Sequence, residues 1–455
     1  IEIDREFVVA TVLMIVGTGL FFWSVAGMVT GVLQRFSGIY WRGLTAFTFR
    51  QLSTRFNGAC ATLSVVCVLL FLALTTFSTG VGLASMFTEG VKEGTQFDDT
   101  ITLYPSDYSV KGIPDELKDP IGTLAADSKN WQAVVGSAAA LHVFSTDIEL
   151  ESVVNKLPEG VTSAQVLEGM RGYCFQAVGE SEFNELRRLC GREPISVGST
   201  GYAVTNTVVG MQSIADAMVS SDAELSLGGV KLRPVAEPVS QGLSVSAVGQ
   251  DSCVLVVPDS VAAKLAKEGF SQGVKVNIKF ADPDVSSDLV QKMNDEIAYG
   301  SQESYGAYCL TAAEISEQAV TIRFLVTYLA IYIGFVLLMA TAAILSIQQL
   351  SSASDSQMRY RTLAQLGCGK RRLFGSLRTQ TLVYFLAPLG LACCHWACAF
   401  KVLQSNLFTF MGAINLSPVL LAGALVLVVY GIYLLVSYYG SRSIIVQATG
   451  KRLLR

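Results

Sequence analysis

The chain has 455 residues and a mass of 48.8 kDa, a length that could hold two or three soluble domains. Hydrophobic residues make up 51% of it and charged residues only 15%, against roughly 25% charged in an ordinary soluble domain. The mean hydropathy is +0.46 and the net charge is −4. These values exclude a disordered chain, a nucleic-acid-binding protein with a basic surface, and most soluble enzymes.

Five apolar stretches are each long enough to cross a bilayer, which takes about 20 residues. They lie at approximately 7–32, 58–86, 319–347, 381–403 and 416–440. The third carries one charge, Arg323, in its first turns, where a long side chain reaches the interface at little cost. The sequence therefore predicts a polytopic α-helical membrane protein with five transmembrane helices, surrounded by the lipid bilayer.

Basic residues gather on one side of this arrangement, as they do in cytoplasmic loops. Segments 33–57 and 348–380 hold four and six of them against one acid, and four more follow residue 440. The region 87–318 holds 33 acidic and 16 basic residues. We therefore expect a multi-pass protein of the plasma membrane in which 87–318 is extracellular, the start of this chain lies outside, and its C-terminus is cytoplasmic. The basic residues behind this orientation are Arg35, Arg42, Arg50, Arg55, Arg359, Arg361, Lys370, Arg371, Arg372, Arg378, Arg442, Lys451, Arg452 and Arg455.

The chain begins with Ile1 instead of Met, and acidic residues precede its first span. A signal peptide would have a basic start and a shorter apolar run. We therefore expect this chain to be the C-terminal part of a longer polytopic protein.

The region 87–318 is large enough for a core of its own. Residues 274–280 alternate apolar and polar side chains, which is typical of a half-buried strand. The apolar runs 253–257 and 101–104 each stop at a proline and predict two further strands.

Helices are expected over 181–190 and 259–268, with Ser181 and Asp259 as their N-caps. Together with the strands, they predict a large α+β domain inserted between transmembrane helices two and three. The third span has no break after Ala312, so we expect it to be mechanically continuous with this domain. The predicted organisation is a first span with a cytoplasmic amphipathic helix (1–57), a second span (58–86), the extracellular domain (87–318), and three spans with a cytoplasmic coupling segment at 355–380 (319–455).

Four cysteines fall in the predicted extracellular region, where an even number permits disulfides such as Cys174–Cys190 but leaves the connectivity open. They are Cys174, Cys190, Cys253 and Cys309. The two histidines, His142 and His395, are far apart in the sequence and have no cluster of ligands beside them, so a structural role is favoured for both.

Several catalytic and transport motifs are absent from the sequence. It has no G-x-x-x-x-G-K-[ST] phosphate loop, no G-x-S-x-G nucleophile elbow and no chain of acidic residues inside the spans. We therefore expect neither an enzyme nor an ion-coupled transporter, and no cofactor of its own. Any energy for work would come from another subunit.

The cytoplasmic segment 355–380 combines apolar and basic residues around glycines. Leu363 and Leu366 share a helical face, and Gly367 can end that helix because glycine accepts the left-handed conformation. Leu373 and Phe374 follow, behind a basic cluster. Two amphipathic pieces joined by a glycine turn could dock into a groove on a partner, or could lie on lipid headgroups as an ordinary cytoplasmic loop.

Segment 40–57 is an imperfect amphipathic helix. Trp41, Leu44 and Phe47 share one broad side with Leu52, whereas Arg55 breaks the pattern. Such a helix is expected to anchor at the membrane interface before the second span.

The pattern around the coupling segment resembles the signature of FtsX-like (MacB-like) ABC-transporter permeases. It consists of Arg359-Tyr360, Leu363, Leu366-Gly367, Arg371-Arg372-Leu373 and Gln380. Four other stretches are similar to the peptide-antibiotic, bacitracin-resistance-type branch of that family, namely 347–351, 384–389, 181–195 and 256–259.

The resemblance implies a core of one helix, an outer domain and three helices, which here would be spans two to five after one extra helix. It also implies a separate ABC ATPase that binds ATP and contacts the coupling segment. The residues implied for this ATPase contact are Arg359, Leu363, Leu366, Gly367, Arg371, Arg372, Leu373 and Phe374.

Two functions are compatible with this resemblance. In the first, the chain is a permease subunit that transmits force from ATP hydrolysis to the outer domain and confers resistance to cationic or lipid-bound antimicrobial peptides, together with a sensor histidine kinase. In the second, it regulates a cell-wall hydrolase, as FtsX-type proteins do, and moves no substrate.

Overall fold

The structure is a computed structural model that describes residues 5–34, 43–105, 113–158, 160–161, 170–268, 270–300, 305–406 and 416–449. Some residues used above fall outside these ranges. They are Arg35, Arg42, Lys451, Arg452 and Arg455 of the charge pattern and residues 40–42 of the predicted amphipathic helix.

The chain divides into two compact units. We call the first the helical unit (Ile1–Gly82, Val326–Val402 and Asn415–Arg455) and the second the sheet unit (Leu83–Leu325 and Leu403–Ile414). Two helices, α3 (Thr45–Gly94) and α12 (Ala312–Asp355), contribute residues to both units without interruption.

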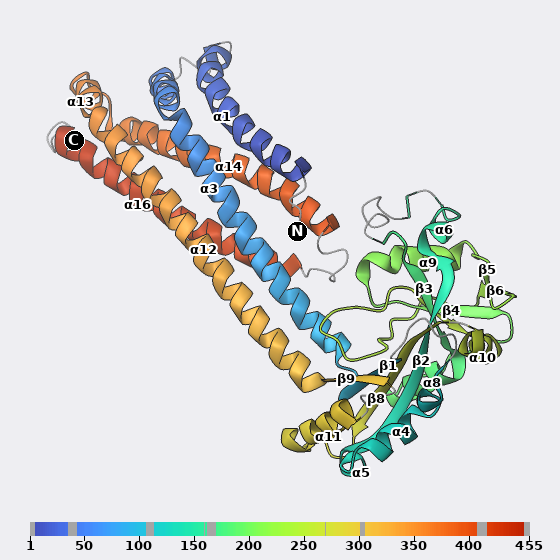
Figure 1. The fold of residues 1–455 in the computed structure, drawn as a ribbon. Coiled ribbons are helices and arrows are strands. Elements are labelled where there is room, and N and C mark those ends of the chain that lie inside the picture. Colours follow the sequence, from blue (N-terminus) through green and yellow to red (C-terminus); the bar gives the residue numbers. More distant parts are fainter. Residues whose placement is uncertain are drawn as a thin grey trace. The chain divides into compact units, whose positions relative to one another are not determined.

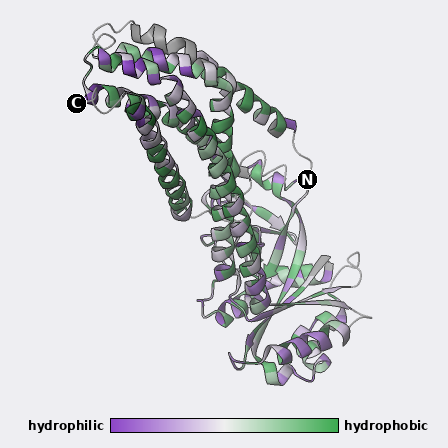
Figure 2. Cartoon of the chain, turned by 90° about the vertical axis from the view of Figure 1, so that its left-hand side faces the viewer, coloured by the Kyte–Doolittle hydropathy of each residue, from purple (hydrophilic) through white to green (hydrophobic). Residues whose placement is uncertain are grey.

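Among the described residues, five helices are long and apolar enough to cross a membrane, which confirms the predicted spans. Hydrophobic residues run along these long helices in Figure 2. Besides α3 and α12 they are α1 (Arg5–Gln34), α14 (Lys370–Asn406) and α16 (Leu416–Thr449), and the short α13 (Gln357–Gln365) precedes α14. Which side of a membrane each end faces stays a prediction.

The helical unit is held by apolar side chains and by close approaches of small residues. Phe22, Leu70 and Phe385 are buried in one cluster shared by α1, α3 and α14. A Cβ added at Gly80 of α3 would lie 2.1 Å from the Cβ of Ala330 on α12, so only a glycine permits this approach.

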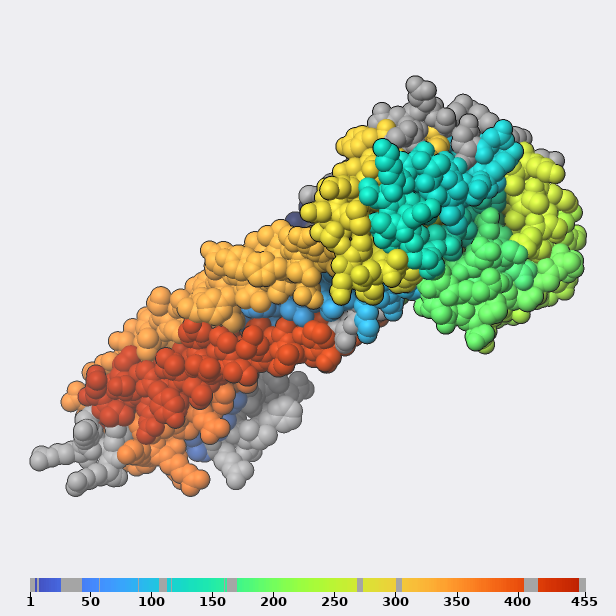
Figure 3. All heavy atoms as spheres, turned by 90° about the horizontal axis from the view of Figure 1, so that it is seen from below, coloured from blue at the N-terminus to red at the C-terminus, as the bar shows by residue number. Residues whose placement is uncertain are grey.

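Polar side chains add specific links between the same helices. The Oγ1 of Thr18 on α1 lies 3.0 Å from the Nε2 of His395 on α14, which links these two helices. Helices α12 and α16 lie side by side in Figure 3, and Ser346 and Ser437 share a hydrogen bond of 2.8 Å between them.

The predicted interfacial helix is wrong as a separate element. Residues from Thr45 onward form the beginning of α3. Leu52 and Phe56 are buried among the other helices, and Leu44 and Phe47 also pack against them. Because these contacts come from distant parts of the chain, an amphipathic pattern could not distinguish them from contacts with lipid.

The described residues of the sheet unit form one mixed sheet of nine strands. Figure 1 shows the sheet with helices around it. The strand order is β5-β6-β4-β7-β3-β2-β8-β1-β9. The strands are β1 (Asp99–Pro105), β2 (Val135–Glu149), β3 (Cys174–Gly179), β4 (Gly201–Thr205), β5 (Leu225–Leu227), β6 (Val230–Pro234), β7 (Val254–Val257), β8 (Phe270–Phe280) and β9 (Tyr305–Thr311). The helices around it are η1 (Asp115–Leu117), α4 (Pro120–Asp127), α5 (Trp131–Val134), α6 (Leu150–Val154), α8 (Glu180–Leu189), η2 (Val209–Met211), α9 (Gln212–Ser220), α10 (Asp259–Glu268) and α11 (Ser287–Gly300).

All three predicted strands and both predicted helices are present, so the inserted α+β domain is confirmed. β7 is a central strand covered on both faces, since Leu255 and Val257 pack in one cluster and Val254 and Val256 in another. That burial on both faces explains its continuous apolar sequence.

The predicted cap at Ser181 is wrong, because α8 begins one residue earlier and its N-cap is Gly179. The predicted cap at Asp259 is also wrong, because Asp259 is the first residue of α10 and its side chain caps α8 instead. Its carboxylate accepts hydrogen bonds from the backbone N–H and the hydroxyl of Ser181 in the first turn of α8. This contact ties the starts of α8 and α10 together.

The two long helices join the sheet at neighbouring strands. Helix α3 leads into β1 after four residues, and α12 starts directly after β9. β1 and β9 are paired antiparallel, with Asp99 opposite Thr311. Thr311 and Glu314 form a reciprocal capping box at the start of α12, since the Thr311 hydroxyl accepts from Glu314 N (3.1 Å) and the Glu314 carboxylate accepts from Thr311 N (3.0 Å).

Candidate functional site

The coupling segment forms a helix, a glycine turn and the start of a second helix. α12 ends at Asp355, and α13 follows after a single residue, Ser356. The turn after α13 has Gly367 at φ +83°, with Gly367 N bonded to Ala364 O and Cys368 N bonded to Leu363 O. These two bonds are the Schellman arrangement, so the predicted glycine cap is confirmed. The second piece is longer than expected, because it is the beginning of α14.

One side of the coupling segment is buried within this chain. Leu373 is 1% exposed and packs with Tyr360, Leu377 and Ile445. Phe374 is half-buried, and the guanidinium of Arg442 lies 4.8 Å from the centre of its ring. The expectation that Leu373 fills a pocket on a partner is therefore corrected: its side chain holds α14 against α13 and α16.

A buried polar network fixes the same side. The Gln380 amide donates to the Tyr360 hydroxyl (3.2 Å) and to the Ser376 hydroxyl (3.1 Å). Ser376 in turn shares a bond of 2.6 Å with Thr48 of α3. Two residues of the family-like motif, Tyr360 and Gln380, thus meet in space and lock α13 to α14 and α3.

The other side of the segment is open. Leu366 is 78% exposed and Met358 is 71% exposed, at opposite ends of α13, about 12 Å apart along a helix of this length. Leu363 is half-buried, whereas Arg359, Arg371 and Arg372 are exposed, as are Gly367, Arg361 and Lys370. We call Met358, Arg361, Leu366, Lys370 and Arg371 the open face. Met358 was not among the residues predicted from the sequence, although its spacing from Arg361 and Gln365 places all three on one side of a helix.

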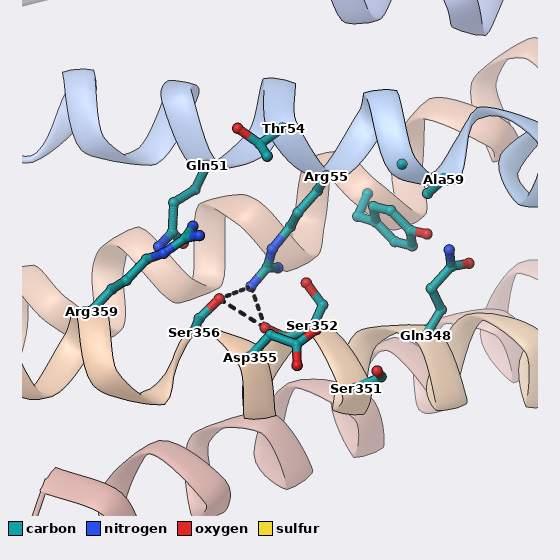
Figure 4. Close-up of a pocket in the computed structure, with 12 residues that line it drawn as sticks. Gln51, Thr54, Arg55, Ala59, Gln348, Ser351, Ser352, Asp355, Ser356 and Arg359 are labelled. Carbon is teal, nitrogen blue, oxygen red and sulfur yellow. Dashed lines mark hydrogen bonds between the residues drawn. The ribbon is translucent and has the colours of Figure 1, made fainter.

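A polar pocket of about 300 Å³ lies beside the open face, between α3, α12, α13 and α14 (Figure 4). Arg55 reaches into it and donates to the Ser352 carbonyl (3.3 Å) and the Ser356 hydroxyl (3.2 Å). The arginine that broke the amphipathic pattern therefore points inward, to a polar site. The pocket is lined by Gln51, Thr54, Arg55, Gly58, Ala59, Gln348, Ser351, Ser352, Asp355, Ser356, Arg359 and Tyr384.

The sheet unit has a pocket of similar size around His142. The Glu182 carboxylate accepts from His142 N (2.8 Å) and lies 2.7 Å from His142 Nδ1, and the Leu117 carbonyl lies 2.8 Å from Nε2. Burial disfavours the charged imidazole, but Glu182 and the Leu117 carbonyl outweigh it, so the pKa of His142 is raised. Both ring nitrogens have partners, which agrees with the structural role expected for His142.

The four cysteines considered for disulfides are free thiols. Cys174 begins β3, Cys190 follows α8, Cys253 precedes β7 and Cys309 lies in β9. The thiol of Cys190 is directed to Gln96 and Gln241, so the bridge to Cys174 is not formed. Within the described ranges, no three His, Cys, Asp or Glu side chains form a group that could hold a metal ion.

Neither a protein-family model nor a curated protein matches this chain. What stands on its own residues is a multi-pass membrane protein with a large inserted soluble domain.

Proposed function

We propose that the chain is the membrane subunit of an ABC-type complex, with a separate ATPase docked on the open face of α13 and the turn after it. The observation that carries this proposal is Leu366. Its side chain is almost fully exposed at the tip of a turn whose opposite side is packed and hydrogen-bonded within the chain. A rigid segment that presents an apolar tip among basic side chains suits a groove on a partner.

In this proposal, the two long helices transmit the movement produced by ATP hydrolysis from the docked ATPase to the sheet unit. α12 has 44 residues and α3 has 50, about 66 and 75 Å at 1.5 Å per residue. Both continue into the sheet unit, where they join the paired strands β9 and β1. A displacement of one helix along the other would therefore act directly on that strand pair.

The outer partner in this proposal is a cationic or lipid-bound antimicrobial peptide, and the outcome is resistance to it. The support is electrostatic, because the region 87–318 carries 33 acidic against 16 basic residues. Such an excess raises the rate at which cations reach a surface, within the screening limit of about 8 Å in physiological salt.

The docking proposal is tested with the full chain co-expressed with the ABC ATPase encoded nearest to it. Met358→Asp and Leu366→Asp should reduce co-purification of the ATPase and the stimulation of its activity. Each apolar side chain buried in an interface contributes about 1.5–3 kcal/mol, so each change should weaken binding by roughly ten- to a hundredfold.

Val235→Asp is the matched control, because Val235 is an exposed apolar residue of the sheet unit. It should leave ATPase binding unchanged. Equal co-purification with wild type, Met358→Asp and Leu366→Asp chains would show that the ATPase docks elsewhere or that none is a partner.

A further inference from the structure

The polar pocket beside α13 contains buried polar atoms that have no hydrogen-bond partner among the residues that the structure describes. Gln51 is 4% exposed and neither of its amide atoms has a hydrogen-bond partner. The Nη1 of Arg55, the Oε1 of Gln348 and the hydroxyl of Tyr384 also lack partners. A buried polar atom without a partner costs free energy, so a cluster of five such atoms around one hollow favours a polar ligand there.

The charge of the pocket favours an anion. Arg55 and Arg359 line it, against one carboxylate, that of Asp355. The two acceptors that Arg55 does bind, a carbonyl and a hydroxyl, are neutral. An arginine fork with a free nitrogen matches a phosphate or carboxylate oxygen better than any other common partner.

The floor and rim of the pocket differ. Gln51, Ala59, Ser356 and Tyr384 are buried and form the floor, whereas the rim residues Thr54, Ser351, Asp355 and Arg359 are exposed. A ligand can therefore enter from the rim. The volume of about 300 Å³ is at the lower end of ligand pockets, which suits a headgroup better than a whole nucleotide.

The position along the helices indicates where the ligand comes from. Arg55 precedes by three residues the apolar stretch of α3 that starts at Gly58, and Asp355 is the last residue of α12. The pocket thus lies where two predicted spans leave the hydrocarbon core, at the depth of lipid headgroups. The free oxygens of Gln51 and Gln348 call for hydroxyl donors beside the phosphate.

We propose that this pocket binds the phosphate of an anionic lipid whose headgroup carries hydroxyls, with the phosphate on Arg55 and Arg359 and the hydroxyls on Gln51 and Gln348. The residues proposed to bind the lipid are not part of the open face, so lipid binding can be tested separately from ATPase docking.

Lipid binding is measured by native mass spectrometry on the full chain, in detergent, titrated with phosphatidylglycerol or phosphatidylcholine. The wild type should retain one phosphatidylglycerol in preference to phosphatidylcholine. Arg55→Gln should weaken that binding by about ten- to a hundredfold, the range for a lost charge-assisted hydrogen bond. Arg50→Gln is the matched control, because Arg50 is an exposed arginine five residues earlier on α3 and does not line the pocket.

A second pair guards against misfolding of the Arg55 variant, since Arg55 also links α3 to α12. Arg359→Gln removes an exposed rim arginine and should weaken binding, whereas Arg361→Gln, two residues further on α13, should not. In a further titration, inorganic phosphate replaces the lipid. If it saturates the site and phosphatidylglycerol binds no better, phosphate recognition holds and its source is soluble phosphate.

Two outcomes would overturn the proposal. One is equal retention of phosphatidylglycerol and phosphatidylcholine by the wild type, with no effect of phosphate. The other is a wild-type affinity in both Arg55→Gln and Arg359→Gln. Either result would mean that water alone satisfies the buried groups.

Discussion

Asp99 is a buried carboxylate at the point where α3 enters the sheet. It is the first residue of β1, is 0% exposed, and lies between the paired strands β8 and β9. No hydrogen bond of good geometry from the described residues reaches its carboxylate oxygens, although the Asn294 amide and the backbone N–H groups of Thr100 and Leu310 lie close by. Burial raises the pKa of Asp99 to about 6, because the Asn294 amide and the backbone N–H groups of Thr100 and Leu310 oppose it only in part and the charge of Glu314 adds to it.

The raised pKa of Asp99 makes the stability of the fold depend on pH. An ordinary Asp has a pKa of about 3.9. Between about pH 4 and about pH 6, Asp99 therefore keeps its proton in the folded state but has lost it in the unfolded state. The free energy of unfolding therefore falls as the pH rises through this window. The difference between the folded and unfolded pKa of Asp99 corresponds to about 3 kcal/mol, by which the charged Asp99 destabilises the folded state at neutral pH.

Asp99→Asn should remove this cost. The variant should be up to about 3 kcal/mol more stable than the wild type at neutral pH and about equal to it below pH 4, because both side chains are then neutral. The new amide can also donate to the Oδ1 of Asn294, which lacks a partner.

Urea unfolding of the full chain in detergent, followed by pulse proteolysis of the sheet unit at several pH values, measures this difference. Asp98→Asn is the matched control. The Asp98 carboxylate accepts from Lys279 Nζ (3.0 Å) and Phe280 N (2.9 Å), so this change should destabilise the fold. If Asp99→Asn keeps the wild-type slope between pH 4 and pH 6, or destabilises as Asp98→Asn does, the reasoning about burial is refuted.

Two further predictions concern one contact in each unit. Glu182→Gln should lower the free energy of unfolding of the sheet unit, by about 1.5–3 kcal/mol for a hydrogen bond to a charged group. The pKa of His142 is raised in the folded state, so the loss of stability relative to wild type should be largest below about pH 6.5 and should shrink as the pH rises. A loss of stability that grows with pH would contradict this prediction. Gly80→Val should lower the free energy of unfolding of the helical unit by about 1–3 kcal/mol, because the new side chain overpacks against Ala330. Gly423→Val is the control and should have no such effect, since a Cβ at Gly423 meets no atom within 4 Å. Equal melting temperatures of the two variants would contradict this prediction.

The spans and the main strands could be predicted because their signals are local. A run of about 20 apolar residues, the alternation in β8 and the glycine after α13 each specify structure within one segment. The limits of the helices were harder to predict, since α3 continues from Thr45 through what the pattern predicted as a separate interfacial helix. Whether its apolar face meets lipid or protein depends on distant helices.

The two leucines of the coupling segment show the same limit at the scale of a side chain. Leu366 and Leu373 both fitted a docking surface by spacing, yet one is exposed and the other is buried. Ile445, which covers Leu373, comes from α16 and is 72 positions away in the sequence. No local pattern contains that contact.

The polar pocket, in contrast, left a signal that could have been used. Gln51 and Arg55 are four residues apart on α3. Gln348, Ser352 and Asp355 have helical spacing at the end of α12. Two polar stripes, each at the end of an apolar span, predict that the spans meet there around a polar site.

The pocket and the open face share one structural element, and this links the two proposals. Only Ser356 separates α12 from α13, and its hydroxyl accepts the hydrogen bond of Arg55 from α3. A partner that moved α13 would therefore strain the contact between α3 and α12, the two helices that continue into β1 and β9. An anion held by Arg55 and Arg359 would tie α3 to α13 more firmly and oppose independent movement of the two helices. Bound lipid would thus add a second link between α13 and α3 to the hydrogen bond from Arg55 to Ser356, and would strengthen transmission through α3 and α12 as a pair.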